Sequence, residues 1–108
     1  MSDYLFSYGT LQQEAVQQYV FRRTLQGNKD VLPGYRIATK KIYGRYLVLE
    51  ATAVNGAQVA GIVYALTSAE LLQADVYEGP AYVRRHIRLK SGRKAWVYLE
   101  KSGAQNTE

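Results

Sequence analysis

The 108-residue chain contains no cysteine, a single histidine and only two prolines, and none of its apolar runs approaches the length needed to cross a bilayer. The absence of cysteine excludes disulfides, thiol nucleophiles and thiolate metal sites, and one histidine is a poor basis for a zinc site. We therefore expect neither a metal nor a cofactor. Any catalysis would have to use carboxylates, hydroxyls, backbone amides or basic side chains.

The N-terminus lacks the basic and apolar regions of a signal peptide, so we expect a cytoplasmic protein with no membrane partner. The hydrophobic content of 47% shows no bias toward disorder, and the length suffices for one hydrophobic core but not for two. We predict a single domain over residues 1–100. Residues 101–108 have almost nothing to bury and should form a frayed tail.

The net charge of +5 would attract an anionic ligand and raises the possibility of nucleic acid. The basic residues, however, come in scattered pairs such as Arg22-Arg23 and Arg84-Arg85, which argues against a nucleic-acid surface. The ten tyrosines could stack on bases, but tyrosine is also a common strand residue that buries its ring.

An aromatic and apolar segment, residues 5–8, predicts a buried strand that turns through Gly9 into a helix. Glycine permits a backbone conformation, or a close approach of a ligand, that a β-carbon would hinder. Thr10 and Gln13 fit a capping box. Helical spacing predicts a long helix over residues 11–25 that ends at residues 27–29. Its inward-facing residues would be Leu11, Ala15, Tyr19 and Val20.

Further along, alternating or continuous apolar residues predict strands at 35–39, 43–50, 59–66, 82–89 and 95–99. For residues 43–50 a short buried helix is an alternative. Asn55-Gly56 predicts a tight hairpin, and Gly61 indicates a bulge or a close contact. A second capping box, residues 67–70, opens a short helix that Gly79-Pro80 ends. Its inward residues would be Leu71, Leu72 and Val76.

This order of elements predicts an α+β domain. The sheet should be mixed and mainly antiparallel, curled into a small β-barrel with one long and one short flanking helix.

Glu78 ends the short helix and lies between Tyr77 and Tyr82 in the sequence. The unpaired carbonyls of a helix end and the exclusion of water by aromatic rings would both raise its pKa, which would make it a better general base. The alternative is an exposed glutamate before a helix-stopping glycine. Arg84 has a comparable alternative as a solvated residue or an ion-pair partner.

Two motifs carry a resemblance to a known family. Tyr8-Gly9-Thr10-Leu11 resembles the Tyr-Gly-Ser/Thr-Leu signature of the γ-glutamylcyclotransferase-like (avirulence-induced-gene-like) family. The second signature is matched by Asp75-x-Tyr77-Glu78-Gly79-x-x-Tyr82-x-Arg84, and residues 95–98 look like the last strand of that family. The order and separation of the motifs fit, and the resemblance covers about residues 4–100.

The resemblance implies a small mixed barrel whose cavity opens where the two motifs meet. In such enzymes the turn amides hold the α-carboxylate of a γ-glutamyl group, and the glutamate matching Glu78 is the acid/base residue that helps to form 5-oxoproline. The residues expected to bind the substrate are Tyr8, Gly9, Thr10, Leu11, Tyr82 and Tyr98. Either Tyr82 or Tyr98 could stabilise the oxyanion, and Asp75 is the rival of Glu78 as base.

The chemistry implied is an intramolecular aminolysis, which needs no covalent nucleophile and suits a chain without cysteine or metal. We therefore expect an enzyme that acts on a small γ-glutamyl amine or γ-glutamyl amino acid. Two alternatives are a non-catalytic module of the same fold that binds a small carboxylate, and a nucleic-acid-binding small barrel.

Overall fold

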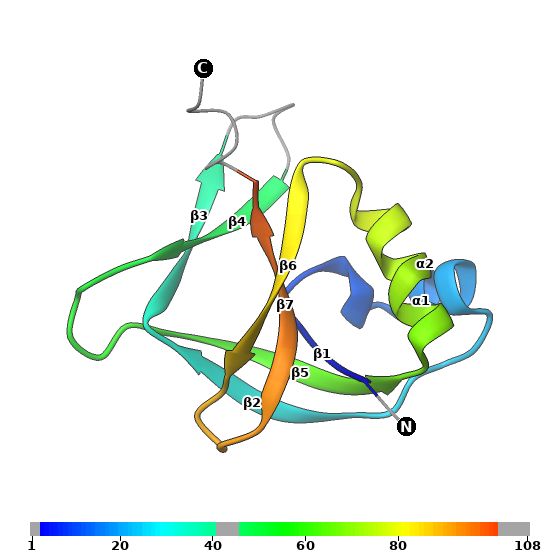
Figure 1. Cartoon of the computed structure of the whole chain (residues 1–108), viewed down its shortest axis with the longest axis horizontal. Coiled ribbons are helices and arrows are strands. Elements are labelled where there is room, and N and C mark those ends of the chain that lie inside the picture. The colour runs from blue at the N-terminus through cyan, green and yellow to red at the C-terminus, as the bar shows by residue number, and fades with distance from the viewer. Residues whose placement is uncertain (1–2, 41–45, 102–108) are drawn as a thin grey trace.

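The structure, a computed structural model, describes residues 3–40 and 46–101 (Figure 1). Its elements, in chain order, are β1 (Asp3–Ser7), a 3-10 turn (Thr10–Gln12), α1 (Glu14–Phe21), β2 (Gly27–Pro33), β3 (Tyr35–Lys40), β4 (Tyr46–Ala51), β5 (Gln58–Leu66), α2 (Ser68–Glu78), β6 (Tyr82–Arg88) and β7 (Lys94–Glu100). The predicted frayed tail, apart from residue 101, lies outside the described residues.

The strands form a five-stranded sheet in the order β2-β5-β1-β7-β6 and a two-stranded sheet of β3 and β4. Every pair is antiparallel except β1 with β7, which is parallel. The predicted α+β class with a mixed, mainly antiparallel sheet is therefore confirmed, although the sheet does not close into a complete barrel. Both helices pack on one face of the large sheet, while β3 and β4 lie on the other (Figure 1).

Strand β1 is the middle strand of the large sheet and is buried on both faces. Successive side chains of a strand point to opposite sides, so Leu5 and Phe6 join two different cores. Leu5 packs with Phe21 of α1 and Leu71 of α2, and Phe6 packs in the core that includes Leu49 of β4. This double burial fixes the end of β1, where the first motif begins.

The predicted long helix over residues 11–25 is wrong at both ends. Gln13 is extended, with ψ at 134°, and separates the 3-10 turn from α1. At the other end Arg22 adopts a left-handed conformation, with φ at 61°, and stops the helix after Phe21. The first helix therefore has eight residues and the second eleven, which reverses the predicted lengths. Two of the residues predicted to face inward do not, because Tyr19 is 82% exposed and Ala15 is exposed too.

The segment interpreted as a helix stop, residues 27–29, is instead the start of strand β2. Gly27 pairs with Tyr64 of β5, and a β-carbon at Gly27 would collide with the side chains of Ile62 and Tyr64. Glycine here serves the close packing of two strands, a role that the local sequence does not distinguish from a helix stop.

Helix α2 begins as predicted. The Thr67 hydroxyl accepts from the Glu70 amide while the Glu70 carboxylate accepts from the Thr67 amide, and Gly79 ends the helix with φ at 88°. Leu71 is buried as expected, but Leu72 and Val76 are exposed. No helix in the described part of the chain is long and apolar enough to span a membrane.

The strands at 35–39, 59–66, 82–89 and 95–99 are confirmed as β3, β5, β6 and β7, with small differences at their ends. Residues 46–51 are strand β4, so the helical alternative is wrong there, and residues 43–45 lie outside the described part.

The Asn55-Gly56 turn exists, but only Gly56 has a positive φ, and the turn connects strands of two different sheets, so the hairpin prediction is wrong. Gly61 makes the close contact that was expected, because a β-carbon there would lie 2.5 Å from the Phe6 ring and from the Ser7 carbonyl oxygen.

Candidate active site

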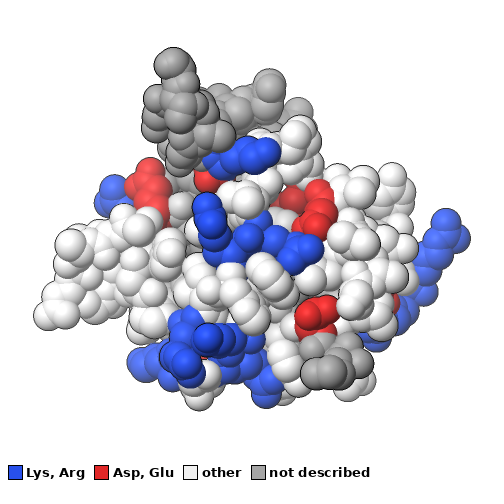
Figure 2. Space-filling view, viewed as in Figure 1, with Lys and Arg blue, Asp and Glu red and all other residues white. Residues whose placement is uncertain are grey.

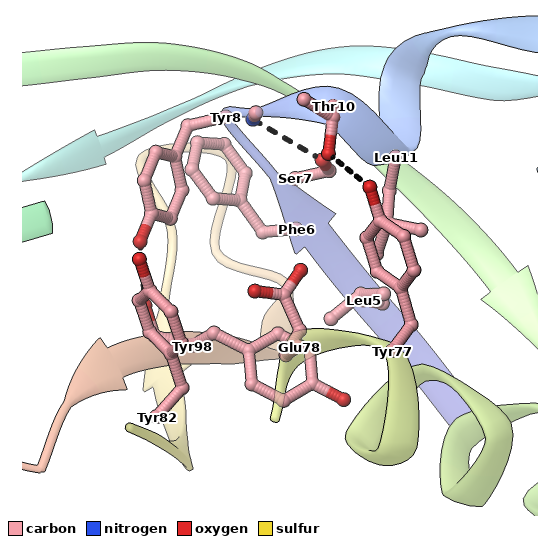
Figure 3. A pocket seen from close by; sticks show the side chains of 11 residues that line it. Leu5, Phe6, Ser7, Tyr8, Thr10, Leu11, Tyr77, Glu78, Tyr82 and Tyr98 are labelled. Atoms are coloured by element: carbon pink, nitrogen blue, oxygen red, sulfur yellow. Dashed lines mark hydrogen bonds between the residues drawn. The ribbon is translucent and has the colours of Figure 1, made fainter. Parts of the chain in front are cut away.

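A cavity of about 450 Å³ opens where the end of β1 meets the C-terminal end of α2 and strands β6 and β7 (Figure 3). All seven residues with a predicted role in the site line it, together with Leu5, Phe6, Ser7 and Tyr77. The seven are Tyr8, Gly9, Thr10, Leu11, Glu78, Tyr82 and Tyr98. The fold thus brings the two sequence motifs to opposite walls of one cavity.

The turn after β1 forms one wall. Thr10 begins the 3-10 turn, and no described residue accepts a hydrogen bond from the backbone amides of Thr10 and Leu11. Amides at the start of such a turn have no partner within it and suit an anionic acceptor. This wall can therefore donate to a small group such as a carboxylate.

The predicted capping box at Thr10 is wrong, because no side chain caps either the 3-10 turn or α1. The Thr10 hydroxyl lies instead 2.6 Å from the hydroxyl of Tyr77, which is 67 residues further along the chain (Figure 3). A tertiary hydrogen bond has replaced the local one, and it ties the turn directly to the end of α2.

Gly9 lies in the cavity wall with φ at −134°, so its backbone does not require glycine. No heavy atom of another described residue lies within 4 Å of the place that a β-carbon would occupy. A side chain at this position would therefore affect whatever occupies the cavity and not the packing of the protein.

Glu78 is the last residue of α2, and its carboxylate points into the cavity from the wall opposite the turn (Figure 3). Burial raises the pKa of Glu78 from its ordinary value of 4.5 to about 7. The raised pKa was expected, and burial is its cause. A carboxyl group with this pKa is present in both protonation states near neutrality, as proton transfer in either direction requires.

Tyrosines form much of the remaining wall. The Tyr8 hydroxyl donates to the backbone carbonyl of Tyr98 at 2.8 Å, and the Tyr98 hydroxyl donates to Oδ1 of Asp75 at 2.6 Å. Burial raises the pKa of Tyr8 and of Tyr98 well above the ordinary range. Both phenols are therefore neutral over the range in which Glu78 titrates.

Asp75, the rival base, is held in a different state. Burial favours its neutral form, but hydrogen bonds from Arg84 and Tyr98 outweigh burial and lower its pKa. Arg84 contacts both carboxylate oxygens, at 2.7 and 3.0 Å. Asp75 is thus ion-paired and not poised near neutrality, and Arg84 is the ion-pair partner that one interpretation of the sequence expected. Within residues 3–40 and 46–101, no group of three or more His, Asp or Glu side chains could hold a metal ion.

The sequence model of the gamma-glutamyl cyclotransferase, AIG2-like family matches residues 5–108. The chain belongs to this family. Membership is consistent with the two motifs and with the cavity that they form. No curated protein matches the chain.

Several solved structures share the fold. A protein from Arabidopsis thaliana, solved in solution, is 25% identical with a TM-score of 0.80, and the match covers 94% of this chain and 64% of that one. A solved gamma-glutamyl cyclotransferase is 15% identical with a TM-score of 0.76, and the match covers 94% of this chain and 68% of that one. A uropathogenic E. coli-specific protein is 17% identical with a TM-score of 0.71, covering 99% and 85%. This chain therefore spans about two thirds of the length of the first two.

Sequence reasoning missed Ser7 as part of the site. Ser7 is buried, and its hydroxyl accepts a long hydrogen bond, 3.4 Å, from the Gly9 amide. Leu5 and Phe6 were interpreted as packing residues only, yet both also reach the cavity. Their position just before the Tyr-Gly-Thr-Leu motif is the one sequence signal that could have indicated this.

Proposed function

We propose that this chain is a γ-glutamylcyclotransferase-like enzyme that converts a small γ-glutamyl amine or γ-glutamyl amino acid to 5-oxoproline and a free amine. The observation that carries the proposal is the position and the raised pKa of the Glu78 carboxyl group. This group, with a pKa of about 7, faces a wall of unpaired backbone amides across one cavity. Membership of the family supports the same conclusion.

In this mechanism the amides of Thr10 and Leu11 hold the α-carboxylate of the substrate, and the ionised Glu78 takes a proton from its α-ammonium. The freed amine attacks the γ-carbonyl carbon, and the bond from that carbon to the departing nitrogen breaks as the lactam closes. Two protons leave the α-nitrogen in total, and both end on the released amine. Glu78 can carry each of them in turn, since its pKa allows it to accept and to return a proton near neutrality.

No covalent intermediate is needed, because nucleophile and electrophile belong to one molecule. The work of the site is to fold the substrate, to hold it there and to move protons. A cavity of about 450 Å³ exceeds what a γ-glutamyl group occupies and leaves space for the amine portion.

The charges of the cavity favour γ-glutamyl amines within the proposed substrate class. Among the described residues that line it, none is lysine or arginine, so a second carboxylate, on the departing amino acid, would find no cation there. An uncharged or aliphatic amine portion suits the apolar and aromatic lining better.

The distribution of charge supports a small-molecule substrate over nucleic acid. On the face seen in Figure 2, lysine and arginine side chains lie in separate groups with uncharged and acidic atoms between them. A nucleic-acid surface would be expected to present a continuous basic track.

The test is to incubate the protein with a panel of γ-glutamyl amines and γ-glutamyl amino acids and to measure 5-oxoproline. We expect product with at least one γ-glutamyl amine, and we expect Glu78→Gln to lower kcat by about 10²–10⁴-fold. The matched control is Glu14→Gln, which makes the same change of charge at an exposed position on α1.

Absence of product with every substrate would refute the proposal. In that case binding of a γ-glutamyl compound to the wild-type chain, measured by calorimetry, would indicate the non-catalytic module instead. Full activity in Glu78→Gln would refute the role of Glu78.

A further inference from the structure

Tyr98 borders two hollows of the surface. On one side lies the cavity that contains Glu78, and on the other lies an open hollow of about 300 Å³ lined by Asp75, Val83 and Arg84, with Tyr82 and Tyr98 common to both. Tyr98 is only 5% exposed, so it is a buried part of the wall that it contributes to both hollows.

The hydroxyl of Tyr98 is already engaged. A phenol has one proton to donate, and that proton goes to Asp75 at 2.6 Å. To donate to a substrate oxygen, Tyr98 would have to break a short hydrogen bond to an ionised carboxylate, which is among the stronger kinds. The alternative that Tyr98 stabilises the oxyanion is therefore disfavoured.

Asp75 is in turn fixed by Arg84. The guanidinium donates to both carboxylate oxygens in a bidentate arrangement and lies 4.5 Å from the centre of the Trp96 ring. His86 stacks on the same ring, with centroids 4.5 Å apart. Arg84 is thus oriented both by Asp75 and by Trp96, so the pair is held in a single geometry.

From this arrangement we infer that Asp75 and Arg84 are positioning residues, an inference that rests on the proposed function. As a charge-neutral pair they hold Tyr98 in the cavity wall, with its hydroxyl proton donated to Asp75. Glu78 is then the carboxylate that exchanges protons with the substrate.

Two further observations support the inference. Asp75 and Glu78 are three residues apart on α2 and therefore lie on neighbouring positions of the helix surface. An unpaired Asp75 would place a second negative charge beside the base, and the positive charge of Arg84 cancels it. Both carboxylates also act on the Tyr98 phenol, whose pKa is raised first by burial, then by Asp75 and to a smaller extent by Glu78.

The inference concerns titration, so every ionisable group near Glu78 matters. Around it these are Tyr8 just after β1, Tyr82 and Arg84 from β6, Tyr98 from β7, and Asp75 and Tyr77 from α2. Asp3 of β1 also acts on Arg84, whose pKa it helps to raise. The pKa of Asp75 is lowered and that of Arg84 is raised, so the two form an ion pair, and replacing each residue singly and both together measures the effect of the pair on Glu78.

The experiment is an NMR titration of the Glu78 carboxyl carbon in the wild-type chain and in Asp75→Asn, Arg84→Gln and the double variant. Arg84→Gln leaves a negative charge unpaired and should raise the Glu78 pKa by about half a unit, while Asp75→Asn leaves a positive charge and should lower it by a similar amount. The double variant should return to the wild-type value. If both single variants shifted the Glu78 pKa in the same direction, or if neither shifted it, the inference would be overturned.

Kinetic measurements provide a second test. Asp75→Ala and Tyr98→Phe each remove the hydrogen bond between Tyr98 and Asp75, so each should lower kcat/KM by about tenfold or less, and the combination should be no worse than the more damaging single change. A loss of 10²-fold or more in Tyr98→Phe, with Asp75→Ala near the wild type, would instead make Tyr98 an oxyanion donor. The titration needs no substrate, so its result stands even if the wild-type chain forms no 5-oxoproline.

Discussion

Replacing Glu78 by glutamine should stabilise the protein while it removes activity. Raising the pKa of Glu78 from 4.5 to about 7 means that the ionised carboxylate is less favourable in the folded chain than in the unfolded one. At about 1.4 kcal/mol for each pKa unit, the cost above pH 7 is at most about 3–4 kcal/mol. Because the carboxylate lines a cavity that solvent can enter, we expect about 2 kcal/mol.

The sign of the pH dependence follows from the same pKa values. Below pH 4.5 the group is protonated in both states and costs nothing, and between pH 4.5 and 7 the folded chain binds more protons than the unfolded chain, so stability falls as pH rises. Glutamine has a similar shape and no charge to desolvate. Glu78→Gln should therefore match the wild type near pH 4 and exceed it by about 2 kcal/mol at pH 8 to 9.

Urea unfolding at a series of pH values measures this difference directly. Glu14→Gln serves again as the control, because it changes the net charge equally at an exposed position and should not reproduce the gain. If Glu78→Gln were no more stable than the wild type at pH 8 to 9, the carboxylate would not be desolvated in the folded chain. The argument for a poised base would then fail as well.

Further predictions follow from individual contacts. In the wild type, kcat/KM for 5-oxoproline formation should rise about tenfold per pH unit below pH 7 and level off above it, because only the ionised Glu78 can accept a proton; a flat profile from pH 5 to 8 would contradict this. Gly9→Ala should leave the urea midpoint unchanged but raise KM by about tenfold or more, and Gly9→Val should abolish binding; unchanged kinetics in Gly9→Val would show that the turn does not hold the substrate. Gly61→Ala is the contrasting change, since its new methyl group meets the Phe6 ring, and it should cost about 1–3 kcal/mol in urea unfolding. Thr67→Ala should cost about 1 kcal/mol through loss of the helix cap, and a cost near zero would show that the cap contributes little.

The turn at Gly9 and Thr10 shows which features could be predicted from neighbouring residues alone. The end of the strand and the presence of a turn were predicted correctly from a short aromatic segment and one glycine. The capping box was not, because its hydroxyl found a partner in Tyr77. The same pattern at Thr67 was confirmed, and there both hydrogen bonds lie within four residues.

The glycines show the same difference between local and tertiary causes. Gly79 ends α2 for a local reason, its positive φ, and the sequence predicted it. Gly27 was misinterpreted as a helix stop because its requirement lies in β5, against Ile62 and Tyr64. Asn55-Gly56 was correctly predicted as a turn but wrongly as a hairpin, since pairing between strands depends on the whole sheet.

The sequence by itself determined the family, the α+β class, the residues that meet at the cavity and the turns whose causes are local. Hydrogen bonds within a few residues, hydrophobic alternation and motif spacing carry that information. Only the tertiary structure decided where α1 begins and ends, which strands pair, and which of two nearby carboxylates is poised near neutrality. Asp75 and Glu78 are alike in the local sequence, and their difference arises because Arg84 reaches one from β6 while burial alone acts on the other.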